Sequence, residues 1–185
     1  SSHLVRHDHG GKRVTAIATQ FDGKELNSPN DVICDAQGRI WFTDPSYGIM
    51  SDYEGESAEP ELPCQVYRID PDGSLSMVAS DFVKPNGLAF SPDESILYIA
   101  DTGASHAPDG PQHIRALTVS ADGKSLGDSR VFADSTAGLF DGFRVDADGR
   151  VPAGAARAVR ECLDGHGAAR LGRRLPAGLS AQRLT

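Results

Sequence analysis

Three side chains that carry an amide or carboxylate oxygen recur at nearly equal spacing along the chain. Asn30, Asn86 and Asp141 are separated by 56 and 55 residues, and each stands at the same place in a repeated motif. Such oxygens are ligands for hard cations, so a site built from them suits Ca²⁺ or Mg²⁺ better than a soft metal. The alternative is that each residue only forms a turn, because Pro-Asn-Gly and Phe-Asp-Gly are ordinary turn sequences. The recurrence of all three in register favours a shared site.

The motif around these residues is repeated together with the strand that follows it. Segments 28–32, 84–88 and 139–143 carry the three copies, and segments 40–44 and 97–101 follow the first two as Ile-Trp-Phe-Thr-Asp and Leu-Tyr-Ile-Ala-Asp. A period near 50 residues predicts the blades of a β-propeller, in which equivalent positions converge on a central axis. Closed propellers have four to eight blades, whereas this period allows about three here. We therefore expect an incomplete propeller.

Hairpin turns are placed regularly between short apolar runs, which predicts an all-β fold. Four turns begin with Asp or Ser and end in glycine, at Gly38, Gly73, Gly123 and Gly149. Glycine supplies the positive φ that a tight hairpin needs, and the Asp or Ser side chain bonds the turn backbone. A fifth turn, at 91–94, lacks the glycine.

Composition excludes several classes of function. The chain has 185 residues and a formal net charge of −8, which argues against binding to a nucleic-acid backbone. No apolar run is long enough to cross a membrane, and the first residues lack the apolar core of a signal peptide. We therefore expect a cytoplasmic protein, with a periplasmic protein as the alternative, since the chain does not begin with Met and a signal could precede it. Its three cysteines include no Cys-x-x-Cys pair, which excludes a disulfide scaffold and a zinc knuckle. A Gly-x-Ser-x-Gly motif is also missing, which disfavours a serine hydrolase.

The composition changes abruptly near residue 151. Residues 152–185 hold six arginines, two acidic residues and no aromatic residue, whereas residues 1–151 are acidic and hold every Phe, Tyr, Trp and Ile. We therefore expect a partial propeller over 1–151 and an unrelated or disordered tail over 152–185, such as a frameshifted reading of the gene would produce. A basic tail that binds a partner is the alternative.

Four segments resemble the gluconolactonase family, which includes the senescence marker protein and the luciferin-regenerating enzyme. They are 26–32, 41–48, 84–93 and 140–143, in this order, and the likeness covers roughly residues 7–151. The resemblance implies a six-bladed propeller with one divalent cation in its central channel, and hydrolysis of a lactone or related ester. It also implies a fragment, because the match stops before the closing blades.

The resemblance assigns roles to individual residues. Asn86 and Asp141 match the family's metal ligands, Asp141 also matches the carboxylate that activates water, and Asn30 matches a channel asparagine that binds the metal or the substrate beside it. The family's first ligand, a glutamate in the opening blade, has no counterpart here. Ser28 stands where some members have a substrate-binding arginine, and His9 resembles a channel histidine that contacts the substrate.

Other polar residues stand where the loops of a propeller form the mouth of the channel. Asp44 and Tyr47 follow an expected strand, so they would contact a polyhydroxy substrate or, alternatively, cap their loop. His7 and His9 alternate as metal ligands can, with surface or channel-lining histidines as the alternative. The acidic loop 51–61 is expected to be a solvated insertion or a lid near the site.

Together these features predict a metal-dependent hydrolase that opens the ester bond of a small sugar lactone or related ester. Its cofactor would be one divalent cation, Ca²⁺ first, with Zn²⁺ and Mg²⁺ as alternatives. The alternative function is a non-catalytic binding propeller or an inactive fragment. We expect the 185-residue chain to bind Ca²⁺ weakly and to have little activity, because open blade edges lack the neighbours that hold a site in place.

Overall fold

Antiparallel strands make up almost all of the regular structure. The computed structural model describes residues 3–8, 10, 13–52, 56–135, 138–156, 158–163 and 169–170. Within these ranges the two helical elements are single 3-10 turns, η1 (Tyr47–Ile49) and η2 (Gly103–Ser105). Neither turn approaches the length of a membrane-crossing helix, and no helix among the described residues does so. The predicted all-β class is confirmed.

Three four-stranded antiparallel sheets follow one another along the chain, and each is a blade whose strands pair in sequence order. The first blade contains β5 (Val32–Cys34), β6 (Ile40–Asp44), β7 (Gln65–Ile69) and β8 (Leu75–Ala79). The second contains β9 (Pro85–Phe90), β10 (Ile96–Asp101), β11 (His113–Val119) and β12 (Leu126–Asp134). The third contains β13 (Leu139–Phe143), β14 (Val151–Ala156), β15 (Ala158–Leu163) and β16 (Ala169–Arg170).

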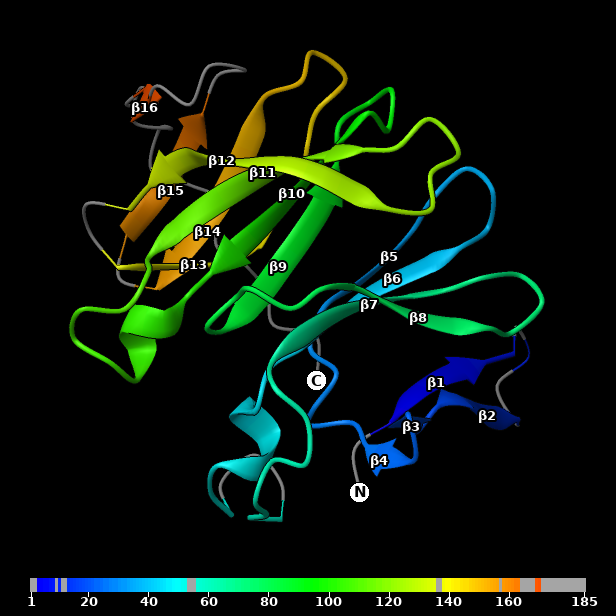
Figure 1. Ribbon diagram of the computed structural model, residues 1–185. Coiled ribbons are helices and arrows are strands. Elements are labelled where there is room, and N and C mark those ends of the chain that lie inside the picture. The colour runs from blue at the N-terminus through cyan, green and yellow to red at the C-terminus, as the bar shows by residue number, and fades with distance from the viewer. Residues whose placement is uncertain are drawn as a thin grey trace.

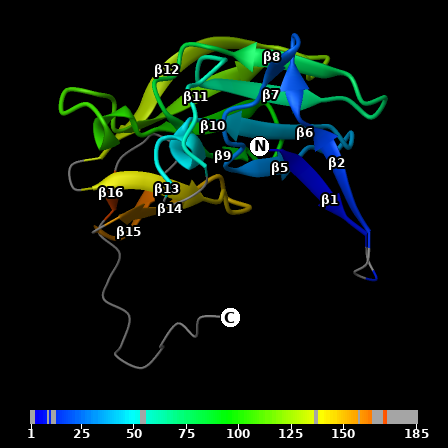
Figure 2. The same ribbon diagram turned by 90° about the horizontal axis from the view of Figure 1, so that it is seen from below.

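Two short hairpins precede the blades, β1 (Leu4–His7) with β2 (Val14–Ala18) and β3 (Gln20–Phe21) with β4 (Lys24–Glu25). Figures 1 and 2 both show the hairpin β1–β2 beside the first blade and the third blade beside the second. Strand β9 of the second blade contacts both β5 and β13, so the entry strands of the three blades are neighbours. This arrangement is the partial propeller that the repeat predicts.

The turns form as their sequences predict. Each of the four turn glycines has a positive φ, between 65° and 87°, and its N–H bonds back to the carbonyl of the Asp or Ser that opens the turn; they are Gly38, Gly73, Gly123 and Gly149. In the fifth turn, Glu94 takes the same conformation, with φ 57°, and its N–H bonds to Ser91 O at 2.9 Å. The turn geometry is therefore kept even where its sequence lacks glycine.

Apolar side chains are buried mainly between successive blades. Trp41 and Val66 of the first blade pack with Leu97 and Ile99 of the second, all fully buried. A second cluster joins the second and third blades, with Tyr98, Ala100, Ile114, Phe132, Phe140, Phe143 and Val151 among its members. Each blade thus depends on its neighbour for burial, as in other repeat architectures.

A buried ion pair also joins the first two blades. Arg39 Nε lies 2.5 Å from Asp35 Oδ2, and Arg39 Nη1 donates to Asp122 O, in the β11–β12 turn, at 2.8 Å. Trp41 Nε1 donates to the same Asp35 oxygen at 2.9 Å. Burial raises the pKa of Asp35, but hydrogen bonds from Trp41 and Arg39 outweigh it and hold that pKa below its usual value. The arginine therefore fixes both its own turn and the neighbouring blade.

The third blade extends past the predicted domain boundary. Residues 151–156 form β14, in which Ala155 pairs with Phe140 and Ala153 with Phe143. The expected division after residue 151 therefore falls inside a strand, although its Pro-Ala-Gly sequence lacks the aromatic residues of the equivalent strands. Residues 171–185 lie outside the described residues, so the separate character of that segment stays a prediction.

Arg39 offers a direct test of the link between blades. Arg150 has the same sequence context, Asp-Ala-x-Gly-Arg, but its side chain is 52% exposed, whereas that of Arg39 is 9% exposed. We expect Arg39→Met to lower the free energy of unfolding by about 3–5 kcal/mol, because it leaves the buried Asp35 carboxylate without its partner. Arg150→Met should cost about 0.5 kcal/mol or less. Urea unfolding of both variants is the measurement, and equal losses would contradict this account.

Candidate functional site

The three oxygen-bearing residues of the repeat meet at one cavity. Asn30 precedes β5, Asn86 lies in β9 and Asp141 lies in β13, and all three line a hollow of about 430 Å³. Asn86 is half-buried, while Asn30 and Asp141 are exposed. No side-chain hydrogen bond from these three to another described residue is formed, so their oxygen atoms are available to a ligand. The predicted convergence of the repeat positions is thus present.

One buried hydroxyl connects two of the three segments. Asn30 N donates to Thr43 O at 2.9 Å, and Thr43 Oγ1 donates to Asn86 O at 2.9 Å. The same hydroxyl accepts from Asp31 N at 3.2 Å. Since Thr43 is fully buried, these bonds are shielded from competing water and hold the backbone of Asn30 and Asn86 in a fixed relation.

Close backbone packing brings the third segment to the other two. A Cβ at Gly87 would lie 2.3 Å from Asp141 O and 3.0 Å from Gly142 Cα, so only glycine lets β9 and β13 approach so closely. On its other side β9 is tied to the first blade, because Leu88 N donates to Asp31 Oδ2 at 3.2 Å. The position of Asp141 relative to Asn86 therefore depends on the absence of a Cβ at Gly87.

Gly87→Ala tests this packing. The added methyl meets backbone atoms that cannot rotate away, so we expect a loss of about 1–3 kcal/mol in the free energy of unfolding and displacement of Asp141. Gly142→Ala is the matched control, because a Cβ there meets nothing within 4 Å and its φ is not positive. Thermal and urea unfolding would give the two values. A Gly87→Ala protein as stable as the control would show that the strands are not packed in this way.

Asp44 occupies a buried position away from the cavity. It is fully buried, and its Oδ2 accepts from Asn27 N at 2.9 Å. This is the geometry of loop capping, which was the alternative to the predicted substrate contact. Asp44 lines neither the 430 Å³ hollow nor a second hollow of about 840 Å³ beside it. Asp101 holds the equivalent place in the second blade, where its carboxylate accepts from Val83 N and Lys84 N, both at 2.9 Å.

The carboxylates of Asp44 and Asp101 differ in the number of hydrogen bonds that they accept. Gly103 N gives Asp101 a third donor at 3.3 Å, whereas Asp44 Oδ1 and the nearby Asn27 Oδ1 are buried without a partner among the described residues. Burial disfavours the charged form, so it raises the pKa of Asp44 to about 7, although backbone hydrogen bonds from Asn27 and Ser28 oppose the rise. Asp44 is therefore largely neutral below neutral pH, unlike an ordinary aspartate.

This difference predicts a pH dependence of stability. The folded protein holds a proton on Asp44 that the unfolded chain releases near pH 4, so the contribution of Asp44 to stability is full below about pH 4 and is lost as pH rises to about 7. At roughly 1.4 kcal/mol per pKa unit, the loss is up to about 4 kcal/mol. Asp44→Asn should remove it, so that the variant gains stability over the natural protein as pH rises from 4 to 7.

Asp101→Asn is the control for Asp44→Asn. It replaces one of two engaged oxygens by a donor, so we expect it to destabilise the protein by about 1–3 kcal/mol at every pH. Urea unfolding at several pH values would separate the two behaviours. The account fails if the difference between the Asp44→Asn and natural proteins does not change with pH.

Tyr47 reaches the cavity, as its predicted substrate contact requires. Its side chain is half-buried, and its hydroxyl bonds Thr102 Oγ1 across the boundary between the first and second blades. Ser28, which stands at the position of the missing arginine, accepts from Gly48 N at 2.9 Å and donates to Pro45 O at 2.7 Å. Ser28 therefore shapes the loop that carries Tyr47.

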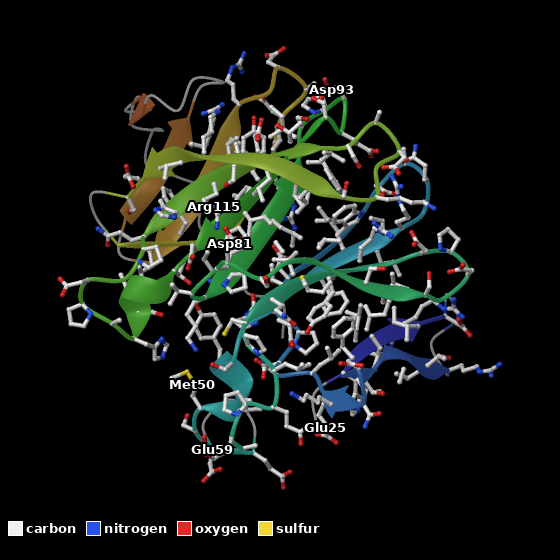
Figure 3. All side chains as sticks on the ribbon, in the orientation of Figure 1. Glu25, Met50, Glu59, Asp81, Asp93 and Arg115 are labelled. Atoms are coloured by element: carbon white, nitrogen blue, oxygen red, sulfur yellow. The ribbon has the colours of Figure 1, made fainter. Side chains whose placement is uncertain are left out.

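Two other predictions concern the surroundings of the cavity. A second hollow of about 840 Å³ adjoins the first, sharing Asn30 and Tyr47, and several acidic residues line it; they are Glu25, Asp52, Glu56, Glu59 and Glu61. In Figure 3 the labelled Glu25 and Glu59 lie on the same side of the molecule as Met50, next to η1. The acidic loop thus borders the site, as expected. His9 lies outside the described residues, so its predicted contact stays a prediction.

Sequence reasoning missed three residues of the cavity wall. Thr102, Ser105 and His106 follow the second strand of the second blade, just as Tyr47 follows the second strand of the first. The sequence signal that could have found them is their position after Asp101, which is equivalent to that of Tyr47 after Asp44. This signal was weak, because the loops that follow the two aspartates have no other residue in common at equivalent positions.

The fold and the site together define a propeller whose blade entries present side-chain oxygen atoms to a common cavity. The family model described as the SMP-30/Gluconolactonase/LRE-like region matches residues 1–164, and the chain belongs to this family. It is similar to the gluconolactonase of Zymomonas mobilis, with 31% identity over 161 residues, which cover 82% of this chain and 43% of the relative.

Solved structures agree with this assignment. A gluconolactonase from Xanthomonas campestris superposes with a TM-score of 0.79 and 38% identity, covering 89% of this chain and 52% of that one. The calcium-binding protein regucalcin of Agrobacterium tumefaciens superposes with a TM-score of 0.68 over 92% of this chain and 53% of that one, and its 22% identity makes this a likeness of fold. The chain spans about half the length of these relatives.

Proposed function

We propose that this chain supplies part of a metal-dependent hydrolase of sugar lactones. The observation that carries the proposal is the meeting of Asn30, Asn86 and Asp141 at one cavity, where none of their side chains is hydrogen-bonded to another described residue. Relatives named gluconolactonase support the substrate class. A cytoplasmic location and a small-molecule lactone as the partner belong to the same proposal.

The donor set fits a hard divalent cation. Two amide oxygens and one carboxylate are the ligand types that Ca²⁺ and Mg²⁺ prefer, and Zn²⁺ also accepts carboxylate oxygen. Asn30, Asn86 and Asp141 would hold the ion, with Ca²⁺ the first choice because the set contains oxygen alone. When bound, such an ion polarises the carbonyl of the lactone and stabilises the negative charge that develops on its oxygen.

The residues of the chain supply the remaining chemistry. Asp141 is exposed in the cavity and has no partner in the described protein, so its carboxylate can accept a proton from the attacking water. As the new carbon–oxygen bond forms and the ring bond breaks, Asp141 returns that proton to the leaving ring oxygen. Asn30 and Asn86 keep their amide N–H groups for the substrate when their oxygens bind a cation. Tyr47 closes the cavity on the side of η1.

Hydrolysis of glucono-δ-lactone, followed at constant pH by titrating the acid released, tests this proposal. We expect turnover to exceed the buffer rate, to vanish with chelator and to return with Ca²⁺. Because the chain covers 52% of the Xanthomonas enzyme, its rate should be well below that of the relative.

Asp141→Asn gives the sharper form of the test. It should lower turnover at least about 100-fold, since it removes both a charged ligand and the proton acceptor. Asp81→Asn is the control, because Asp81 pairs with Arg115 at 2.6 Å outside the cavity. Turnover that survives chelator, or that Asp141→Asn leaves unchanged, would exclude the proposed mechanism.

A further inference from the structure

One lysine side chain reaches from the second blade to the turn that carries Tyr47. Lys84 directly precedes β9, and its ammonium donates to Ser46 Oγ and lies 3.6 Å from Met50 Sδ. Its Nζ also lies over the Tyr47 ring, 5.6 Å from the ring centre. All three partners belong to the segment 46–50, which contains η1 of the first blade. The contacts of this ammonium are therefore made across the boundary between two blades.

These contacts, and no ion pair, hold the Lys84 ammonium. The residue is half-buried, and among the described residues no carboxylate lies within ion-pair distance of Nζ. An ammonium has three N–H groups to donate, and a hydroxyl, a thioether and the face of an aromatic ring can each accept one. The face of the ring also attracts a cation electrostatically. Because its three partners lie on one short segment, the ammonium fixes that whole segment.

The backbone of Lys84 is fixed independently by the second blade. Its N–H donates to Asp101 Oδ1 at 2.9 Å, and its carbonyl oxygen accepts from Thr102 N at 3.0 Å and from Thr102 Oγ1 at 3.2 Å. The same Thr102 oxygen bonds the Tyr47 hydroxyl. The side chain of Lys84 therefore starts from a point that three hydrogen bonds hold. Tyr47 is held at two places, at its hydroxyl by Thr102 and over its ring by Lys84.

The segment that Lys84 holds supplies one wall of the cavity. Tyr47 and Met50 line the hollow of about 430 Å³ together with Asn86, whereas Lys84 does not line it. Lys84 stands two residues before Asn86, so the length of one lysine side chain connects this wall to the strand that carries Asn86. Removal of the ammonium would release the segment 46–50 from the start of β9 and change the width of the cavity.

We propose that Lys84 is a positioning residue, which holds Tyr47 and Met50 where they contact the ring and hydroxyls of a bound sugar lactone. The positioning follows from the contacts of Lys84 itself, whereas the identity of the ligand rests on the proposed lactonase function. Lys84 acts through the segment 46–50, because it does not line the cavity. Its substitution should therefore change the binding of the ligand more than the chemical step.

The NMR signal of the Lys84 ε-methylene group tests the positioning directly. The chain has four lysines, so lysine labelling gives a simple spectrum, in which Lys84→Arg identifies the signal of Lys84. Because an aromatic ring shields protons that lie over its face, we expect this signal at a lower chemical shift than those of the other lysines. Tyr47→Phe keeps the ring and should keep the shielding, whereas Tyr47→Leu should abolish it. A Lys84 signal that coincides with those of the other lysines, or that Tyr47→Leu leaves unchanged, would overturn the proposal.

Steady-state hydrolysis of glucono-δ-lactone tests the effect on the cavity. We expect Lys84→Met, which keeps the apolar stem and loses the charge, to raise KM about tenfold while kcat changes less than about threefold. Lys84→Arg keeps a cation that can lie over the ring, so it should recover most of the affinity. Lys124→Met is the control, because Lys124 is exposed in the β11–β12 turn. It removes the same charge and should leave both constants unchanged.

Two kinetic results would reject the role of Lys84 in ligand binding. One is a fall in kcat at constant KM, and the other is an arginine variant no better than the methionine variant. A natural protein that does not hydrolyse the lactone would overturn this role together with the proposed function. The lysine signal would still decide whether Lys84 holds Tyr47, so the positioning and the proposed function fail separately.

Discussion

The close backbone approach of β9 and β13 at Gly87 is the constraint on which the rest of the site depends. Because Gly87 has no Cβ, the backbone of β9 in the second blade contacts the backbone of β13 in the third blade. This contact places Asp141 beside Asn86. On the opposite side of β9, the buried Thr43 hydroxyl and the Asp31 carboxylate bind the same strand to the first blade. Strand β9 is thus fixed to both the first and the third blade. Because β9 lies between them, the entry segments of all three blades line one cavity.

The blades are not independent supports for this cavity. Two of the three buried apolar clusters of the described residues join successive blades, and Arg39 of the first blade bonds a turn of the second. The cavity is itself built across boundaries, since Tyr47 belongs to the first blade and bonds Thr102 of the second. A change in how two blades pack would therefore move cavity-lining groups from both blades at once, which couples the stability of the array to the geometry of the cavity.

The sequence predicted those features that are local or strictly periodic. The turn at Gly38 and the register of Asn30, Asn86 and Asp141 follow from residue type and spacing, because a propeller repeats its geometry with its motif. The strand after Val151 was missed, since Pro152-Ala153-Gly154 has a poor strand composition and its pairing with β13 decides its conformation. Tertiary pairing here overrides local preference.

Features that depend on distant partners were beyond sequence reasoning. Asp44 and Asp101 occupy equivalent places, yet the number of backbone N–H groups that reach each carboxylate differs, and only the fold sets that number. No pattern of residue types along the chain contains this information.

The most direct test of the central claim is a titration with Mn²⁺, a paramagnetic substitute for Ca²⁺ or Mg²⁺, while the side-chain amide signals of asparagine and the backbone amide signals of the chain are recorded by NMR. The account predicts that the amide signals of Asn30 and Asn86 broaden together at low Mn²⁺ concentration, that Ca²⁺ reverses the broadening, and that Asp141→Asn abolishes it. Broadening that spares both amides while signals of the acidic loop 56–61 disappear would contradict the claim, because the cation would then bind elsewhere.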